Sequence, residues 1–324
     1  MSNFFKAIVV VFSALTIVSC NKNDDNSVPL RDYAEQYQKD IALIEEFLQT
    51  HYMDVIDHPG FPDDQNVIFT KIPDGGTQTP IWNDPNLVTD FTVDLHDITY
   101  KLYYIKLREG SGPNSKSPCN VDKVLTSYNG KYLYEKTETV NGASTQVLTL
   151  KQFEESINPQ SFFSLTGVIR GWSEVFPKFK TGSYSSNPDG TLSFTDFGAG
   201  VMFLPSGLGY YANSTGSIPA YSPLVFSFKL YEIERVDHDS DGIYSYQEDI
   251  NGDGYVRVLE EGVANPDDTD GDGKPDFLDI DDDGDFFTTK SEIENPLTGD
   301  PYPFDLIPTC SDGKKRHLSN LCHQ

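Results

Sequence analysis

The chain has 324 residues, a formal net charge of −26 and only four cysteines. So negative a chain repels phosphate backbones, which argues against nucleic acid as a partner, and four cysteines are too few for a disulfide-dense scaffold. The charge is uneven, since residues 235–300 contain 21 Asp and Glu against 4 Lys and Arg. We expect that segment to attract cations, and the rest of the chain to supply the hydrophobic core.

The N-terminus has the pattern of an export signal. An apolar run over residues 7–18 is too short to span a bilayer comfortably and is typical of a secretory signal peptide. Ile-Val-Ser-Cys at 17–20 resembles a bacterial lipobox. We therefore expect removal of residues 1–19, a lipid on Cys20 that contacts the membrane, and a polar tether over residues 20–30. These features predict an outer membrane lipoprotein that faces either the periplasm or the cell surface.

Three cysteines remain in the mature chain. Cys310 and Cys322 lie close together in a polar tail over residues 295–324, where an oxidising compartment would let them form a disulfide. Cys119 is left over, either buried or free. None of the three lies in a metal or redox motif, so we expect none to be catalytic.

Residues 31–120 predict a helix followed by strands and loops. Apolar side chains recur every three or four residues from Leu30 to Met53, which predicts an amphipathic helix. That helix would either pack on its own domain or mediate dimerisation. Residues 58–90 are rich in Pro, Gly, Asp and Asn and predict loops with short strands, whereas residues 91–107 alternate like a strand.

Residues 121–234 contain strand patterns separated by Gly and Pro turns. Four motifs occur in order, at residues 124–130, 163–172, 203–210 and 218–226. Together they resemble the FKBP-type peptidyl-prolyl cis-trans isomerase domain. The most specific signature is Val-Ile-Arg-Gly-Trp at 168–172.

This resemblance implies an α+β fold, in which a curved antiparallel sheet wraps over a short α-helix that begins near Trp172. The N-terminal helical extension would precede this domain and an irregular calcium-binding segment would follow it. The resemblance also implies an aromatic catalytic pocket made by Tyr128, Phe153, Glu154, Phe163, Val168, Ile169, Trp172, Tyr210, Ile218 and Phe226.

The roles in this pocket also follow from the resemblance. Trp172 would be the floor on which a proline ring packs, Tyr210 would donate its hydroxyl to a substrate carbonyl, and the Ile169 backbone N–H would bind another carbonyl. Glu154 replaces the Asp of the family, and Tyr211 stands where a Gly commonly follows the pocket Tyr. No cofactor is expected for catalysis. A dry pocket disfavours the planar amide relative to the twisted one, and this lowers the barrier to rotation about the peptide bond, which is about 18–20 kcal/mol in water.

The composition changes sharply to Asp, Gly and Asn after Arg235, and residues 235–294 predict loops that bind calcium. Residues 237–248 form a twelve-residue loop with acids at positions 1, 3, 5 and 12 and Gly at position 6. Further loops are expected to begin at Asp249, Asp268 and Asp279. The last has Lys290 at its twelfth position, although Glu292 could reach in.

The predicted ligands come from all four loops, some through backbone carbonyls. They are Asp237, Asp239, Asp241, Ile243, Glu248, Asp249, Asn251, Asp253, Tyr255, Glu260, Asp268, Asp270, Asp272, Lys274, Asp276, Asp279, Asp281, Asp283 and Asp285.

The first two loops are contiguous, which leaves no flanking helices for a calcium-sensing EF-hand pair. Residues 268–279 instead resemble a thrombospondin type 3 repeat, in which ions substitute for a hydrophobic core. We therefore expect structural Ca²⁺, with a segment that is ordered when calcium is bound and disordered without it. A solvated acidic linker is the alternative.

The leading hypothesis is an enzyme, a lipid-anchored FKBP-type isomerase that acts on proline-containing segments of exported proteins. The alternative is a calcium-stabilised surface binding or adhesion module, or a chaperone, built on a non-catalytic FKBP fold.

Overall fold

The computed structural model describes residues 29–58, 61–140 and 143–323. The expected signal peptide, the lipid site at Cys20 and most of the tether lie outside the described residues. The chain divides into two units, residues 1–31 and 32–324, and the second contains every element below. In the part of the chain that the structure describes, no helix is both long and apolar enough to cross a membrane.

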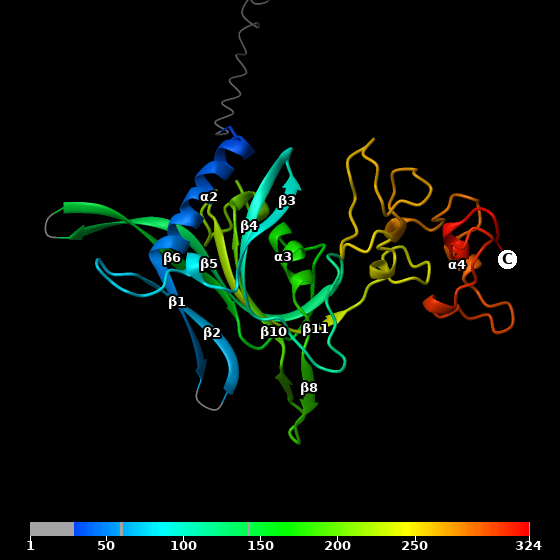
Figure 1. Ribbon diagram of the computed structural model, residues 1–324, viewed down its shortest axis with the longest axis horizontal. Coiled ribbons are helices and arrows are strands. Elements are labelled where there is room, and N and C mark those ends of the chain that lie inside the picture. The colour runs from blue at the N-terminus through cyan, green and yellow to red at the C-terminus, as the bar shows by residue number, and fades with distance from the viewer. Residues whose placement is uncertain (1–28, 59–60, 141–142, 324) are drawn as a thin grey trace, which may run out of the picture. The chain divides into compact units, whose positions relative to one another are not determined.

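The centre of the second unit is an antiparallel sheet with the strand order β3-β4-β10-β11-β5-β6, and a short strand β7 pairs with β5 (Figure 1). Its strands are β3 (Leu87–Leu95), β4 (Ile98–Arg108), β5 (Lys123–Val140), β6 (Ala143–Ser156), β7 (Phe163–Ser164), β10 (Gly198–Leu204) and β11 (Leu224–Glu234).

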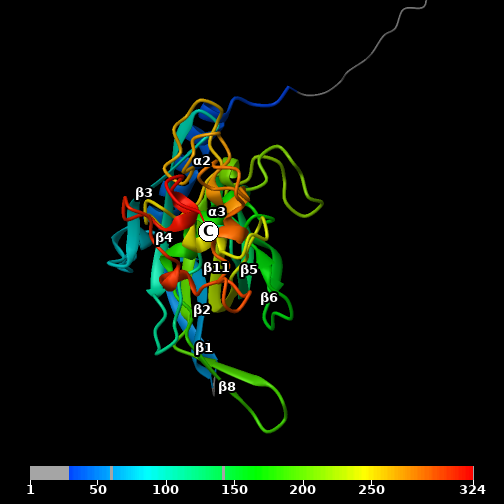
Figure 2. The ribbon, with the colours of Figure 1, turned by 90° about the vertical axis from the view of Figure 1, so that its right-hand side faces the viewer.

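Two hairpins form separate two-stranded sheets. They are β1 (His51–His58) with β2 (Phe61–Lys71), and β8 (Ser183–Ser186) with β9 (Leu192–Thr195). Seen from the side, the β8–β9 hairpin projects beyond the strands of the sheet (Figure 2). The helices are α2 (Tyr33–Thr50), α3 (Arg170–Val175) and α4 (Thr289–Glu292).

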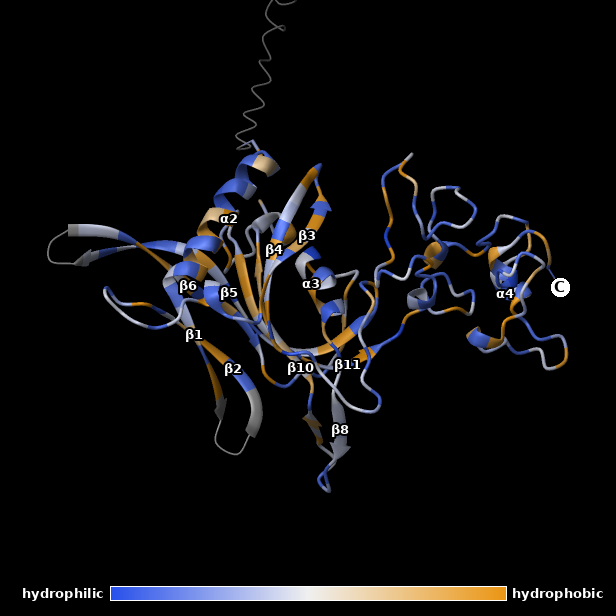
Figure 3. Cartoon of the chain, in the orientation of Figure 1, coloured by the Kyte–Doolittle hydropathy of each residue, from blue (hydrophilic) through white to orange (hydrophobic). Residues whose placement is uncertain are grey.

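Both faces of the sheet are buried. Along β10, Met202 and Leu204 face one hydrophobic cluster, whereas Val201 and Phe203 face another. Because side chains alternate along a strand, a fully buried strand reads as a continuous apolar run, and β10 is mostly orange in Figure 3. The first cluster contains α3 and the second contains α2, so the sheet separates the two helices (Figure 1).

Helix α2 forms as its periodicity predicts. The side chain of Asp32 caps its first turn by accepting a hydrogen bond of 2.9 Å from the backbone N–H of Glu35. Ile44, Phe47 and Leu48 lie on one face and are at most 1% exposed against the sheet. The helix therefore packs on its own domain, which is one of the two roles that the sequence left open.

The sheet extends beyond the domain limits expected from the sequence. Strands β3 and β4 precede residue 121, yet β4 pairs with β10 through Val201 and Ile105. The curved sheet over the short helix α3 gives the α+β fold that was expected, and residues 87–108 are an integral part of it. Residues 58–90 include much of the long β1–β2 hairpin in addition to loops.

Beyond β11 the chain is irregular, with a few short helical turns. Small apolar clusters replace a continuous core, such as Ile243 with Ile293 and Ile307. Cys310 and Cys322 form a disulfide, as expected, and Cys119 is both free and buried.

Candidate functional site

Helix α3 positions Trp172 under the concave side of the sheet. Ile169 precedes the helix in an extended conformation, and every residue from Gly171 to Val175 is buried. A Cβ on Gly171 would lie 2.5 Å from a methyl carbon of the fully buried Leu204, so a larger residue would push this side chain of β10 out of place. Packing therefore favours the glycine of the sequence signature.

Four aromatic rings surround the indole of Trp172. The ring centroids of Tyr128, Phe163, Phe176 and Phe226 lie 5.0, 5.8, 5.3 and 5.4 Å from it, all in edge-to-face arrangements. This geometry is favourable for aromatic quadrupoles. The indole itself is 4% exposed, and its buried Nε1 has no hydrogen-bond partner among the described atoms.

The polar rim of the cluster is formed by Tyr128 and Glu154. The Tyr128 hydroxyl lies near the Glu154 carboxylate, and burial together with this carboxylate raises the pKa of Tyr128. Burial and the nearby Glu154 charge also raise the pKa of Tyr210, so its hydroxyl remains a donor at neutral pH.

The remaining predicted pocket residues gather at the same cluster. Phe153 contacts Phe226 at a centroid separation of 5.6 Å, and Gly130 leaves room for both rings. Ile218 is 3% exposed within the cluster. Val168 and Ile169 pack against it and are partly buried. The structure thus brings together all ten residues that the resemblance assigned to the pocket.

The loop that carries Tyr210 is held by helix α2. Asp40 is fully buried and accepts hydrogen bonds from the backbone N–H of Ser206, at 2.7 Å, and from its hydroxyl. Tyr211 adopts a φ of +49°, a conformation that favours glycine, and its ring stacks on Tyr33 at 4.1 Å. The amphipathic pattern of α2 predicted its packing, but nothing in the sequence indicated this support of the pocket loop.

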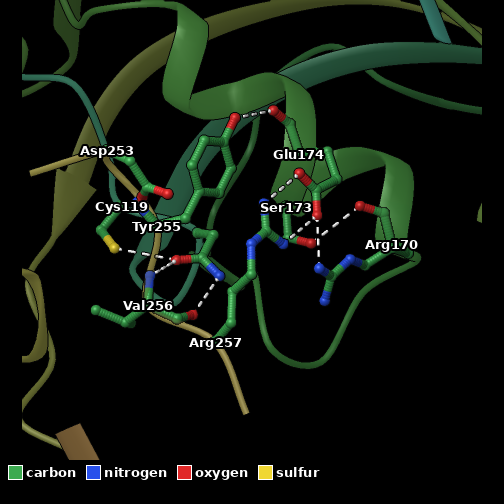
Figure 4. Close-up of polar contacts among 9 residues, drawn as sticks. Cys119, Arg170, Ser173, Glu174, Asp253, Tyr255, Val256 and Arg257 are labelled. Carbon is green, nitrogen blue, oxygen red and sulfur yellow. Dashed lines mark hydrogen bonds and ion pairs between the residues drawn. The ribbon is translucent and has the colours of Figure 1, made fainter. Parts of the chain in front are cut away.

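The acidic segment contacts α3 through Glu174, which is 1% exposed at its side chain (Figure 4). Arg257 donates two hydrogen bonds to the Glu174 carboxylate, at 2.7 and 3.0 Å. Arg170 pairs with the same group at 2.7 Å, and the Tyr255 hydroxyl donates to the Glu174 backbone carbonyl at 2.7 Å. Two residues of the second acidic loop therefore hold the helix that carries Trp172.

Further contacts fix the start of the acidic segment. Arg235 pairs with the fully buried Asp122, and its guanidinium lies 3.8 Å from the ring centroid of Tyr246. The Asn120 side chain exchanges two hydrogen bonds with the backbone of Val256, at 2.8 and 2.9 Å. These pairs connect residues that the sequence assigned to separate domains.

Four acidic loops share one pattern of hydrogen bonds. In each, the carboxylate at the first position accepts from the backbone N–H of the sixth residue. The pairs are Asp237 with Gly242 at 3.1 Å, Asp249 with Gly254 at 2.8 Å, Asp268 with Gly273 at 2.9 Å and Asp281 with Phe286 at 3.0 Å.

The fourth loop therefore begins at Asp281 and not at Asp279. Sequence reasoning aligned Gly284 with the glycine at position 6, but Gly284 occupies position 4, and Phe286 takes the sixth position with a φ of +74°. The corrected register puts Glu292 at the twelfth position in place of Lys290. Glu292 is 1% exposed, and neither of its oxygens has a hydrogen-bond partner among the described atoms.

The predicted acids converge in three of the loops. The convergent groups are Asp237, Asp239 and Asp241; Asp268, Asp270 and Asp272; and Asp281, Asp283 and Asp285. In the second loop, no group of three acidic side chains converges within the described residues, and Glu260 is exposed. Asp276 is buried and accepts two hydrogen bonds of 2.7 Å from Thr269.

The convergent groups fit a hard cation that prefers oxygen ligands. Asp239, Asp241, Asp281 and Asp283 each have a buried carboxylate oxygen with no hydrogen-bond partner in the part of the chain described. Burial and neighbouring carboxylates raise the pKa of Asp239 to about 7 and that of Glu292 to about 8. Both increases in pKa reflect first the burial of a carboxylate and then the repulsion from neighbouring carboxylates.

A separate pocket lies where the β1–β2 hairpin meets β5, β6 and β11. Polar residues make up most of its lining, among them Gln65, Asn66, Ser127, Asn129, Glu155, Ser227 and Lys229. Ser127 and Asn129 flank Tyr128 along β5, so their side chains point to the face opposite the aromatic cluster.

Comparison with known proteins gives one family match and many similar solved structures. The family described as "BamM C-terminal" matches residues 238–317, which include the acidic loops and most of the tail. A search of curated proteins finds no match. The resemblance of residues 268–279 to a thrombospondin repeat stays a prediction.

Two of the similar structures come from bacteria. A peptidyl-prolyl cis-trans isomerase from Pseudomonas syringae pv. tomato aligns at 23% identity with a TM-score of 0.31, over 47% of this chain and 84% of that one. FkpA from Escherichia coli aligns at 23% identity with a TM-score of 0.30, over 47% of this chain and 53% of that one. The chain thus spans about half the length of FkpA. The function proposed below is argued from the residues of the present chain.

Proposed function

We propose that the chain is an FKBP-type peptidyl-prolyl cis-trans isomerase that acts on proline-containing segments of exported proteins. The observation that carries this proposal is the aromatic cluster around Trp172, with the Tyr128 hydroxyl and the Glu154 carboxylate at its rim. A hydrophobic core alone requires no carboxylate at that position, whereas an amide-binding site uses fixed polar groups at the edge of an apolar pocket.

The proposed mechanism is non-covalent. A proline ring packs on Trp172, and its amide leaves water for an apolar site. The planar amide is the more polar form, so desolvation costs it more than the twisted transition state. Because Trp172 is only 4% exposed, side chains of the cluster must move when a proline ring reaches the indole.

Isomerisation of a short X-Pro peptide by the full chain tests this proposal. Tyr210→Phe removes one hydroxyl from the rim, and Tyr184→Phe makes the same change on a tyrosine that is 59% exposed in β8. We expect kcat/KM to fall about two- to tenfold in the first variant, the usual range for one hydrogen bond, and not in the second. Equal activity in both variants would exclude Tyr210 from the site.

We propose further that calcium binds the acidic loops and stabilises them in place of a hydrophobic core. The support is the convergence of buried carboxylates in three loops. Hydrogen exchange of residues 237–294 with calcium and with a chelator tests this. Protection that increases with calcium supports the proposal, and unchanged exchange at millimolar calcium contradicts it.

The cellular location is proposed from the sequence alone. We propose a lipoprotein anchored in the outer membrane through Cys20, facing the periplasm or the cell surface. Cys20→Ser should release the protein from the membrane fraction, and Cys119→Ser, which removes a buried free thiol, should not. A Cys20→Ser variant that stays in the membrane fraction and incorporates labelled fatty acid would contradict the anchor.

A further inference from the structure

Three acids from two different loops meet in the interior of the acidic segment. Asp241 and Glu248 belong to the first loop, and Asp282 belongs to the fourth. Each offers a carboxylate oxygen within 4.8 Å of the others, and their exposed fractions are 2%, 2% and 1%. Asp282 lies between two predicted ligands but was not itself predicted, because the loop pattern gives its position no role.

Five of the six carboxylate oxygens in this group have no hydrogen-bond partner among the described atoms, and the sixth, on Asp241, accepts from the Ile243 backbone N–H at 2.7 Å. Both oxygens of Glu248, both oxygens of Asp282 and one oxygen of Asp241 are buried without a hydrogen bond. An isolated buried carboxylate costs several kcal/mol, and proteins normally offset it with an opposite charge or a metal.

The side chains that act most strongly on Glu248 and Asp282 do not supply a positive charge. The charges that act on Asp282 are those of Asp276, Glu248 and Asp241, and all of them are negative. Glu248 is likewise surrounded by Asp241, Asp239, Asp276 and Asp237.

The chemistry of the donors defines the ion. All candidate ligand atoms are carboxylate oxygens, which excludes cations that prefer nitrogen or sulfur. Ca²⁺ accepts six to eight oxygens in flexible geometry, whereas Mg²⁺ demands a small octahedron and retains water. A nearly dry group that also borders Asp237 and Asp239 therefore suits Ca²⁺ better.

We propose that Asp241, Glu248 and Asp282 bind one calcium ion that connects the first loop to the fourth. The proposal rests on calcium binding by the acidic segment and adds a ligand from outside the first loop. Thr289 holds the new ligand in place, because its hydroxyl accepts a hydrogen bond of 3.2 Å from the Asp282 backbone N–H, and Thr289 is itself fully buried. The ion would thereby join two segments that are distant in sequence.

Calcium titration of the chelator-treated full chain tests the proposal, with Asp282→Asn as the variant. Asp300→Asn is the matched control, because Asp300 is exposed and lies outside the convergent groups. We expect Asp282→Asn to weaken one site at least tenfold and to reduce the calcium-dependent protection of residues 237–248. Protection of residues 268–279 should persist in both variants.

A second readout separates a ligand from a structural residue. Removal of an uncompensated buried charge should raise the Tm of the Asp282→Asn variant without calcium and reduce its Tm gain with calcium. Unchanged affinity, stoichiometry and Tm gain in this variant would overturn the proposal while calcium binding by the loops still held. If the unmodified chain bound no calcium, both this proposal and the proposal that the acidic loops bind calcium would be overturned.

Discussion

Arg257 of the second acidic loop forms a bidentate pair with Glu174 of helix α3, with N–O distances of 2.7 and 3.0 Å. Glu174 is two residues from Trp172, so the pair joins the acidic segment to the helix of the candidate pocket. Bidentate pairs between guanidinium and carboxylate fix orientation as well as position. The acidic segment is therefore part of the structure that supports the pocket.

Replacement of Arg257 should destabilise the chain. Arg257→Ala leaves the buried Glu174 carboxylate with Arg170 as its remaining cationic partner. We expect a loss of about 2 kcal/mol in the free energy of unfolding, less than the full cost of breaking a buried pair because Arg170 remains. Urea unfolding measures the loss.

The matched control for Arg257→Ala is Lys136→Ala. Lys136 forms an exposed pair with Glu138, and such pairs contribute less than about 1 kcal/mol. If both variants lost the same free energy of unfolding, the bidentate pair would have no special role in joining the acidic segment to α3.

Asp40→Asn should loosen the loop that carries Tyr210. The carboxylate of Asp40 accepts two hydrogen bonds from Ser206, and an amide in the same place accepts them more weakly. We expect faster hydrogen exchange for the backbone amides of residues 206–211 and a loss of about 1–2 kcal/mol in stability. Exchange unchanged at residues 206–211 would show that α2 does not hold this loop.

Stability should depend on pH through His51. Burial is the main cause that lowers its pKa to about 4, and Lys71 of the neighbouring strand lowers it further. The unfolded chain, with an ordinary His pKa near 6.5, then binds more protons than the folded chain between pH 6.5 and 4. Stability therefore falls as the pH falls through this window.

His51→Asn isolates that contribution. Between pH 6.5 and 4, the slope of unfolding free energy against pH should fall by the amount that corresponds to the uptake of about one proton on unfolding. The slope above pH 7 should be unchanged. Urea unfolding at several pH values measures both slopes. An unchanged slope below pH 6.5 would mean that His51 titrates normally in the folded chain.

The sequence predicted which residues gather around Trp172 because the motifs that contain them are local. The Gly-Trp pair, the aromatic spacing and the strand alternation can each be recognised within a short stretch of sequence. The positive φ of Tyr211 was not predicted, because the strain is offset by Tyr33, which is remote in sequence. The hydrogen bonds of Asp40 were missed for the same reason, since Ser206 lies in another motif.

The acidic loops show where pattern matching fails. Glycine tolerates a positive φ at positions 4 and 6 alike, so one Gly in the fourth loop fits two registers. Only the backbone hydrogen bond from Phe286 to Asp281 distinguishes them. Asp282 has no position in the loop pattern, and its approach to Glu248 is a tertiary contact that no local motif encodes.

The central claim is tested most directly by exchange spectroscopy on an X-Pro peptide with the full chain. Uncatalysed isomerisation takes tens to hundreds of seconds. We predict that the chain brings exchange into the sub-second range and that Trp172→Ala, in chains shown to be folded, abolishes this acceleration. Exchange at the uncatalysed rate in the presence of the folded, unmodified chain would contradict the account and leave the domain a binding module.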